Sequence, residues 1–175
     1  MNMSTYLGAL TGAIEQLRDT ALEQQLEAAA AAIASAGHIW CTGVGKSARA
    51  ASLLAEDLST LTLPASFIHG GDLLHGGMGR INNRHCLVLF SASGETSELV
   101  HASRAVRGTA RILVTASATP AIEAERLIRH PPQSQAAYPL PGATLVQVVL
   151  GRLLALSAAE QAQIAPTNMA WAHPA

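Results

Sequence analysis

Residues 86–98 read CLVLFSASGETSE, and this stretch decides the fold. Its first half, Cys86–Phe90, is an unbroken apolar run, which is typical of a strand buried on both faces of a sheet. Its second half gathers four hydroxyl side chains around Gly94 and leads into residues 95–106, where the pattern is helical. A buried strand that ends in a polar turn and enters a helix predicts a parallel α/β domain.

The same alternation continues on both sides of this stretch. Short apolar runs predict further strands at 38–42, 64–68, 111–115 and 126–128, and helical patterns predict helices at 47–61, at a short segment opened by Pro120, and at 144–163. Residues 1–36 also have a helical apolar pattern, with Asp19 as a candidate cap for a second helix, and we expect them to pack on the domain or on a partner subunit. No linker or repeat interrupts the chain, so 1–175 is expected to form a single domain with helices on both faces of its sheet.

Composition excludes several classes of protein. The 175 residues are 49% hydrophobic and 13% charged, with a net charge of −1, so the chain is neither disordered nor basic enough to wrap nucleic acid. No uninterrupted apolar run suggests a membrane span, and no signal peptide is visible, so we expect a cytoplasmic protein without nucleic-acid or membrane partners. Cys41 and Cys86 lack CxxC spacing and read as buried reduced thiols.

The first candidate site is the glycine–lysine loop, residues 42–47, which follows a strand and opens a helix. Backbone N–H groups in such a turn bind anions, and Lys46, the sole lysine of the chain, lies within it. The loop matches a Walker A motif only in part, because Trp40 stands where the first glycine belongs. It also matches a dinucleotide fingerprint only in part, because the second strand is not followed by the expected acid. Nucleotide binding and a plain tight turn with a surface lysine are the alternatives.

The second candidate site is the seryl loop, residues 91–98. Its hydroxyls and the N–H groups of the following helix predict a cradle for a small phosphate ester. The simpler interpretation is a helix cap by Ser93, with Glu95 and Glu98 complementing the helix dipole. Both can hold at once, and the number of hydroxyls exceeds what a cap needs. The two glutamates share one helix face, and either is a candidate general base if burial raises its pKa; a solvated acid is the alternative.

The third candidate site is the His–Gly loop, residues 69–80, which holds five glycines and two histidines. Its glycines allow unusual turns and close approach of a ligand. A metal site is not expected, because HxH and HExxH spacings and nearby cysteines are missing. A histidine that moves a proton or donates to a sugar hydroxyl is the favoured role.

These three loops, in this order, resemble the SIS (sugar isomerase) domain family, and above all the isomerase domain of arabinose-5-phosphate isomerases, without the tandem regulatory domains. The resemblance implies a three-layer sandwich, with a five-stranded parallel sheet of flavodoxin-like order flanked by helices. It implies an intramolecular oxidoreductase that interconverts an aldose phosphate and a ketose phosphate through an enediol. It further implies a phosphorylated sugar as ligand, no cofactor, and a homo-oligomer, with a tetramer favoured.

The resemblance also implies roles for single residues. Lys46 falls on the active-site lysine, Glu98 on a catalytic glutamate, and His75 on the histidine of the His–Gly loop. His173, which precedes a proline, falls on a catalytic histidine that the family often supplies across a subunit interface. The expected substrate-binding residues are Gly43, Gly45, Ser47, Ser91, Ser93, Gly94, Glu95 and Thr96.

The sequence departs from the family at one place. Residues 133–138, directly before Pro139-Leu140, contain no acid where the family carries a glutamate, and the Ser/Thr-rich loop that follows is shortened. This departure removes one acid–base group and some substrate contacts. Two alternatives therefore stay open, a phosphosugar-binding sensor without turnover and an enzyme similar to 6-phospho-3-hexuloisomerase.

Overall fold

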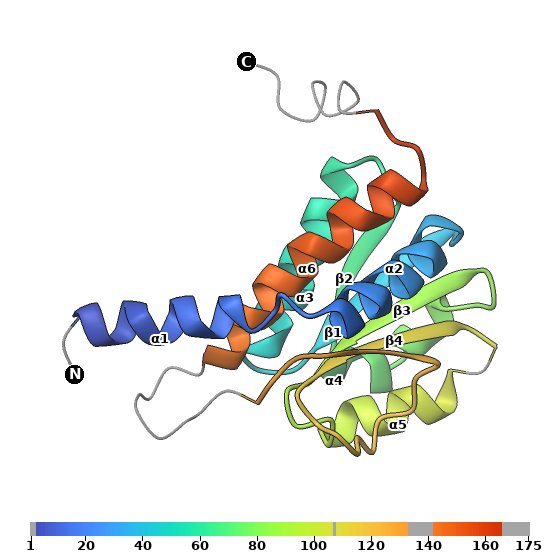
Figure 1. Ribbon diagram of the computed structural model, residues 1–175. Coiled ribbons are helices and arrows are strands. Elements are labelled where there is room, and N and C mark those ends of the chain that lie inside the picture. The colour runs from blue at the N-terminus through green and yellow to red at the C-terminus, as the bar shows by residue number, and fades with distance from the viewer. Residues whose placement is uncertain (1–2, 107, 133–141, 166–175) are drawn as a thin grey trace.

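Five parallel strands form one central sheet with the order β2-β1-β3-β4-β5. The computed structural model describes residues 3–106, 108–132 and 142–165 (Figure 1). The strands are β1 (His38–Gly43), β2 (Ala65–His69), β3 (His85–Phe90), β4 (Ala110–Thr115) and β5 (Arg126–Arg129). The expected five-stranded parallel sheet and its flavodoxin-like order are confirmed.

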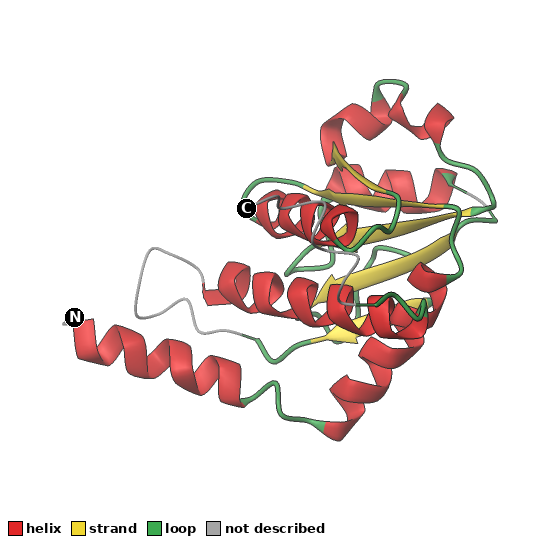
Figure 2. Cartoon of the chain, turned by 90° about the horizontal axis from the view of Figure 1, so that it is seen from above, coloured by secondary structure: helices red, strands yellow, loops and turns green. Residues whose placement is uncertain are grey.

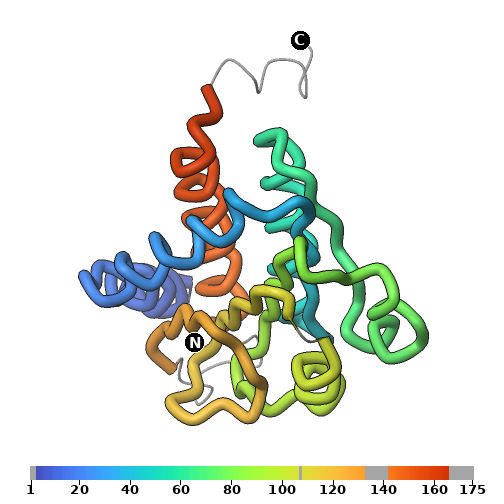
Figure 3. Tube along the Cα trace, turned by 90° about the vertical axis from the view of Figure 1, so that its right-hand side faces the viewer, coloured from blue at the N-terminus to red at the C-terminus, as the bar shows by residue number. Residues whose placement is uncertain are grey.

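Helices cover both faces of the sheet and complete the three layers (Figure 2). One face is covered by α2 (Thr20–Ala34), α3 (Ser47–Thr60) and α6 (Gly142–Gln161). The other face is covered by α4 (Gly70–Leu74), the 3₁₀ turn η1 (Gly77–Arg80) and α5 (Ser97–Ala105). Figure 3 shows the two groups of helices apart from each other.

The larger part of the core lies under α2, α3 and α6. Successive strand residues point to opposite faces, so Ile39 and Cys41 enter this core while Trp40 faces the α4 and α5 side. Both cysteines are free and buried, and burial raises the pKa of the Cys86 thiol to about 12. This agrees with the expectation of inert, reduced thiols.

The N-terminal segment forms two helices rather than one. Asp19 lies between them and caps α2, because its carboxylate accepts a hydrogen bond of 2.7 Å from the amide of Ala21. The first helix, α1 (Met3–Glu15), extends away from the domain and packs against α6 (Figures 1 and 2). Its apolar side chains Met3 and Leu7 are 78% and 54% exposed, so much of its apolar surface lies open.

The last helix, α6, is long and apolar enough to cross a membrane by length and composition alone. Polar residues such as Gln147 and Arg152 interrupt its apolar sequence. The helix packs against α2 and α3, and its buried residues, Val146, Leu150 and Leu154 among them, belong to the main core. We therefore assign α6 to the core of the domain.

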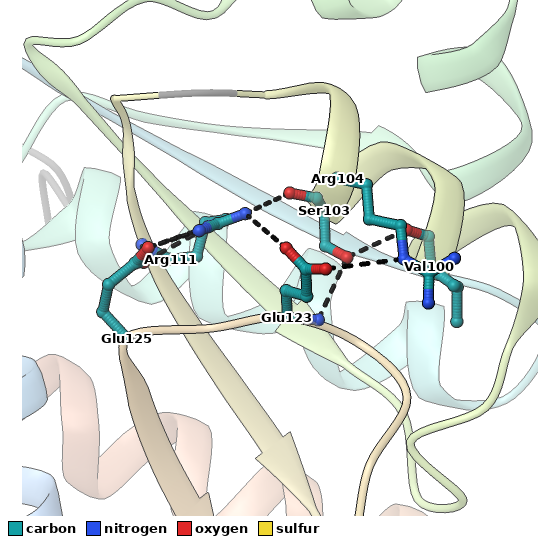
Figure 4. A network of polar contacts seen from close by, with 6 residues as sticks. All are labelled: Val100, Ser103, Arg104, Arg111, Glu123 and Glu125. Atoms are coloured by element: carbon teal, nitrogen blue, oxygen red, sulfur yellow. Dashed lines mark hydrogen bonds and ion pairs between the residues drawn. The ribbon is translucent and has the colours of Figure 1, made fainter.

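Polar side chains at the amino edge of the sheet, where the strands begin, bond mainly to one another (Figure 4). The Arg111 guanidinium donates to the Glu125 carboxylate, with Nε 3.2 Å from each oxygen, and also to the Ser103 carbonyl oxygen. The hydrogen bond from Arg111 lowers the pKa of Glu125. Nearby, the Trp40 indole donates to Nδ1 of His85 at 3.2 Å. The network ties α5, β4 and the segment before β5 together.

Candidate active site

Three loops meet at the carboxyl edge of the sheet, where the strands end. The contacts of Gly70 show this: a Cβ added there would lie 2.6 Å from Cγ2 of Val44 and 3.0 Å from Cδ2 of Leu99. Val44 belongs to the glycine–lysine loop, Gly70 opens α4, and Leu99 lies in α5. Only glycine permits this close approach. The order of the strands reverses between β1 and β3, and open α/β sheets bind ligands at such a switch point.

The seryl loop is held in shape by its own side chains. The Ser91 and Thr96 hydroxyls lie 2.8 Å apart and are hydrogen-bonded, and Ser91 Oγ accepts a 3.1 Å hydrogen bond from the amide of Gly94. Gly94 has a φ of +70°, a left-handed conformation that glycine adopts without strain. The loop is therefore arranged before any ligand arrives, and the Ser93 hydroxyl on its outer side is exposed.

The expectation that Ser93 caps the helix is wrong. Helix α5 begins at Ser97, and its cap residue is Thr96, which makes no side-chain capping bond. Ser93 instead accepts a 3.2 Å hydrogen bond from the amide of Glu95, within the turn. No side chain caps α5, but most of its first amides already have acceptors: the amides of Leu99 and Val100 donate to the Thr96 carbonyl oxygen, and the amide of Glu98 donates to its own carboxylate. What this helix start offers an anion is therefore its dipole, together with the hydroxyls of the loop.

The segment after β4 supports the seryl loop and contains no helix at Pro120, contrary to the sequence-based expectation. The amides of Ala121 and Ile122 donate to the carbonyl oxygen of Gly94 at 2.9 and 3.0 Å. These donors are used by the seryl loop, so they do not build a helical turn. Pro120 also packs against Gly94, where an added Cβ would lie 2.6 Å from its Cβ.

The glycine–lysine loop occupies the end of β1. Lys46 is exposed and stands at the cap position of α3, which no side chain caps. Within the part of the chain that the structure describes, no hydrogen bond or ion pair involves the Lys46 ammonium. A cation without a protein partner at an uncapped helix start suits a negatively charged ligand. The expected substrate-binding residues of this loop, Gly43, Gly45 and Ser47, lie beside it.

Glu98 lies in the first turn of α5 and is only partly buried. A hydrogen bond from its own backbone amide, and next a 2.8 Å hydrogen bond from the Ser97 hydroxyl, lower the pKa of the Glu98 carboxyl, with a further contribution from His69. A pKa raised by burial was the condition under which the sequence made Glu98 a candidate base, and this condition is not met. At neutral pH Glu98 is therefore an ionised carboxylate that can accept a proton. The neighbouring Glu95 is exposed.

The His–Gly loop forms α4 and η1 and places His75 beside a hollow of about 560 Å³. The hollow is lined by Phe67, Ile68, His69, Asp72, His75, Gly76, Gly77 and Arg80. His69 caps α4, because its Nδ1 accepts a 3.2 Å hydrogen bond from the amide of Gly71. No separate role was expected for His69 or Arg80 from the sequence; the position of His69 at the end of β2 is the signal that could have identified it. Within the described residues, no cluster of His, Cys, Asp or Glu could hold a metal ion.

The structure thus places Lys46 at the end of β1 and the seryl loop at the end of β3, both at the carboxyl edge of the sheet. Glu98 lies in the first turn of α5, where His69 of the His–Gly loop is close enough to contribute to the lowered pKa of its carboxyl. His75 lies toward β2, in the hollow of the His–Gly loop, whose lining includes neither Lys46 nor the seryl loop. His173 and the segment around Pro139 lie outside the described residues. One edge of the sheet therefore carries an anion cradle, an unpaired cation and an ionised carboxylate.

The fold and the sequence are similar to those of known proteins. The sequence profile of the SIS domain matches residues 32–157. The arabinose 5-phosphate isomerase KpsF of Escherichia coli is 28% identical over 146 residues, which are 79% of this chain and 46% of KpsF, so the chain spans about half the length of this relative. Among solved structures, the complex of E. coli CFT073 c3406 with arabinose 5-phosphate has a TM-score of 0.85 at 23% identity, covering 99% of this chain and 100% of that one. The Methanococcus jannaschii protein MJ1247, with an inferred function of 3-hexulose-6-phosphate isomerase, has a TM-score of 0.78 at 17% identity and covers 98% of each chain.

Proposed function

The chain belongs to the SIS domain family, and from this premise we propose that it is a phosphosugar aldose–ketose isomerase, similar to arabinose-5-phosphate isomerases. The observation that carries the proposal is the seryl loop, pre-arranged at the carboxyl edge of the sheet, at the same edge as an unpaired Lys46 and an ionised Glu98. The relatives named arabinose 5-phosphate isomerases support a pentose phosphate as the first substrate to test.

The reaction moves a carbonyl between C1 and C2 and needs three kinds of group. Glu98 accepts the proton from the carbon next to the carbonyl, and Lys46 stabilises the charge of the enediolate. The carboxylate then returns the proton to the neighbouring carbon, while the hydroxyl proton passes from the oxygen that becomes the new carbonyl to the oxygen of the former one. His75 or His173 assists ring opening. No redox cofactor takes part, because the two carbons exchange their oxidation states.

The seryl loop holds the phosphate through hydroxyls and helix amides. Phosphate binding positions the reacting carbons against Glu98 and Lys46, so binding energy far from the reacting bond lowers the barrier. We place the enzyme in the cytoplasm as a homo-oligomer, with a tetramer favoured. The exposed apolar side chains of α1, Met3 and Leu7, support contacts with other subunits.

A second candidate function is a phosphosugar sensor without turnover. One observation favours it: no acid precedes Pro139, where the family carries a further glutamate. A hexulose-phosphate isomerase is a third candidate, supported by the similarity in fold to MJ1247.

Proton NMR in D₂O separates these candidates. The pure protein is incubated with arabinose 5-phosphate, ribulose 5-phosphate and a hexulose 6-phosphate. We expect deuterium to enter at C1 or C2 together with conversion to the partner sugar. Line broadening without exchange on every sugar would identify a sensor, and exchange on the hexulose alone would identify the third candidate.

A further inference from the structure

Gln147, in the second turn of α6, is fully buried and bonded to nothing in the described chain. Its exposed fraction is 0%, and neither its Oε1 nor its Nε2 has a hydrogen-bond partner. Among the residues the structure describes, it is the only side chain with two buried polar atoms that lack partners. A buried amide without partners destabilises a fold, so its presence calls for an explanation.

Gln147 lies on the face of α6 that packs into the protein, near the end of the helix at which the chain enters it. Helices α3 and α6 both start at the carboxyl edge of the sheet and run side by side (Figure 1). One turn after Gln147, Gly151 packs between them and the sheet: a Cβ there would lie 3.6 Å from Cβ of Leu54 and 3.8 Å from Cζ of Phe90. Residues four apart share a helix face, and helical side chains lean toward the helix N-terminus. Gln147 therefore leans from this contact toward the end of β3, where Ser91 begins the seryl loop.

We infer that Gln147 is a specificity-determining residue of the phosphosugar site, where its carboxamide hydrogen-bonds a hydroxyl of the sugar; the inference rests on the proposed function. A carboxamide both donates and accepts, as a sugar hydroxyl does, whereas a fully ionised phosphate offers acceptors only. The hydroxyls of the seryl loop and the dipole of α5 already serve the phosphate. Lys46 and Glu98 serve the reacting carbons, so the sugar hydroxyls are the groups that still need a partner.

Such a residue discriminates strongly between ligands. A site built to hydrogen-bond a hydroxyl rejects ligands without it, because its own buried group then stays unpaired. Gln147 lowers the stability of the fold because its buried amide is unpaired. A residue that lowers stability is expected where it is retained for ligand binding. A buried water bonded to Gln147 is the competing explanation, and it predicts no role in binding.

The test compares Gln147→Met with the wild-type protein. Methionine has a similar size and no hydrogen-bonding amide, so the core stays filled. Isothermal titration calorimetry measures the affinity for arabinose 5-phosphate, ribulose 5-phosphate and a hexulose 6-phosphate, and for inorganic phosphate. Thermal unfolding measures Tm. The control is Thr109→Val at the amino edge, which removes a buried hydroxyl that does have a partner, the Asn82 carbonyl oxygen at 2.9 Å.

We expect Gln147→Met to bind the preferred sugar phosphate at least tenfold more weakly, to bind inorganic phosphate as the wild type does within twofold, and to unfold at a higher Tm. Thr109→Val should show the reverse, a lower Tm with unchanged sugar binding. An unchanged affinity of Gln147→Met for the sugar phosphates overturns the inference, whatever its Tm. An equal loss of affinity for the sugar phosphate and for inorganic phosphate also overturns it. If the wild type itself binds none of the sugar phosphates, the proposed function fails first, and that outcome needs no variant to be recognised.

Discussion

Polar side chains gather at both edges of the sheet, but they bond differently at the two. At the amino edge, Arg111 donates to Glu125 and to the carbonyl oxygen of Ser103 (Figure 4). At the carboxyl edge, Lys46 has no partner in the described chain and the amide of Gln147 is enclosed unpaired. One edge satisfies its polar groups internally, and the other leaves key groups without partners.

The difference in bonding between the two edges suggests that the amino edge serves stability and the carboxyl edge serves function. Polar groups that bond to one another hold elements together, whereas groups left unpaired are free to meet a ligand. The seryl loop combines both, because the bond between Ser91 and Thr96 fixes its shape while Ser93 stays exposed. Variants at the carboxyl edge should therefore change turnover more than stability, and variants at the amino edge should do the opposite.

The largest effect is expected for Glu98→Gln. The amide keeps the size of the side chain but cannot accept the proton, so kcat for the isomerised sugar should fall about 1000-fold. Binding of the sugar phosphate should stay within about threefold, because the seryl loop is untouched. Exchange into D₂O and calorimetry measure the two quantities.

Glu160→Gln is the matched control for this variant. Glu160 is exposed near the end of α6, away from the three candidate loops, so its loss should change kcat less than about threefold. If Glu98→Gln keeps wild-type turnover, or if both variants lose it equally, Glu98 is not the base and the functional assignment of the carboxyl edge fails.

The next largest effect is expected at the amino edge, for Arg111→Leu. The Arg111 side chain is only 15% exposed, and its removal leaves the Glu125 carboxylate and the Ser103 carbonyl oxygen without their donor. The free energy of unfolding should fall by about 2 kcal/mol. Urea unfolding measures the loss, and kcat should stay within twofold of the wild type.

Arg104→Leu provides the comparison within the same network. Its guanidinium lies 3.5 Å from Glu123, but its side chain is 59% exposed, so water weakens the pair. The expected loss is at most about 0.5 kcal/mol. Equal losses for the two arginines, or a large loss of kcat in Arg111→Leu, would contradict the division between the edges.

The sequence was sufficient for most of the fold because its strands are buried on both faces. Continuous apolar runs such as Cys86–Phe90 mark such strands clearly, and parallel order follows from the helices between them. The helix expected at Pro120 is missing because the amides of Ala121 and Ile122 bond to Gly94, which is distant in sequence. The helix propensity of a segment does not show that its amides will bond to a distant carbonyl oxygen.

The loops of the candidate site were also found from the sequence, since polar residues after buried strands stand out. The protonation behaviour of their side chains could not be found in this way. The pKa of Glu98 is lowered by its own amide and by Ser97, and this depends on side-chain orientation. The unpaired Gln147 reads in the sequence as one polar residue in an apolar helix, and only the packed structure shows that nothing in the described chain bonds to it. The roles given to Lys46, Glu98, His75 and His173 stay predictions.

The smallest expected effect concerns acid stability, and it compares one histidine at each edge. Burial lowers the pKa of His130, which follows β5 at the carboxyl edge, from its ordinary value of 6.5; burial and the charge of His85 lower the pKa of His38 at the amino edge. The folded protein then binds protons less readily than the unfolded chain, so the free energy of unfolding falls as pH drops below about 7. The loss should be visible between about pH 7 and 5.5, above the range where Glu98 and Glu125 take up protons.

Each histidine should account for its own part of this loss. Urea unfolding of His130→Gln and of His38→Gln should show a shallower decline over that pH range, and the double variant should show the sum of the two changes, because the edges are far apart. His101→Gln, which removes an exposed histidine on α5, should follow the wild type. If the free energy of unfolding of His130→Gln falls with pH as steeply as that of the wild type, protonation of the buried His130 imidazole does not destabilise the fold. If the change in the double variant differs from the sum of the two single changes, the two edges are coupled. Stability and function would then not be divided between the edges.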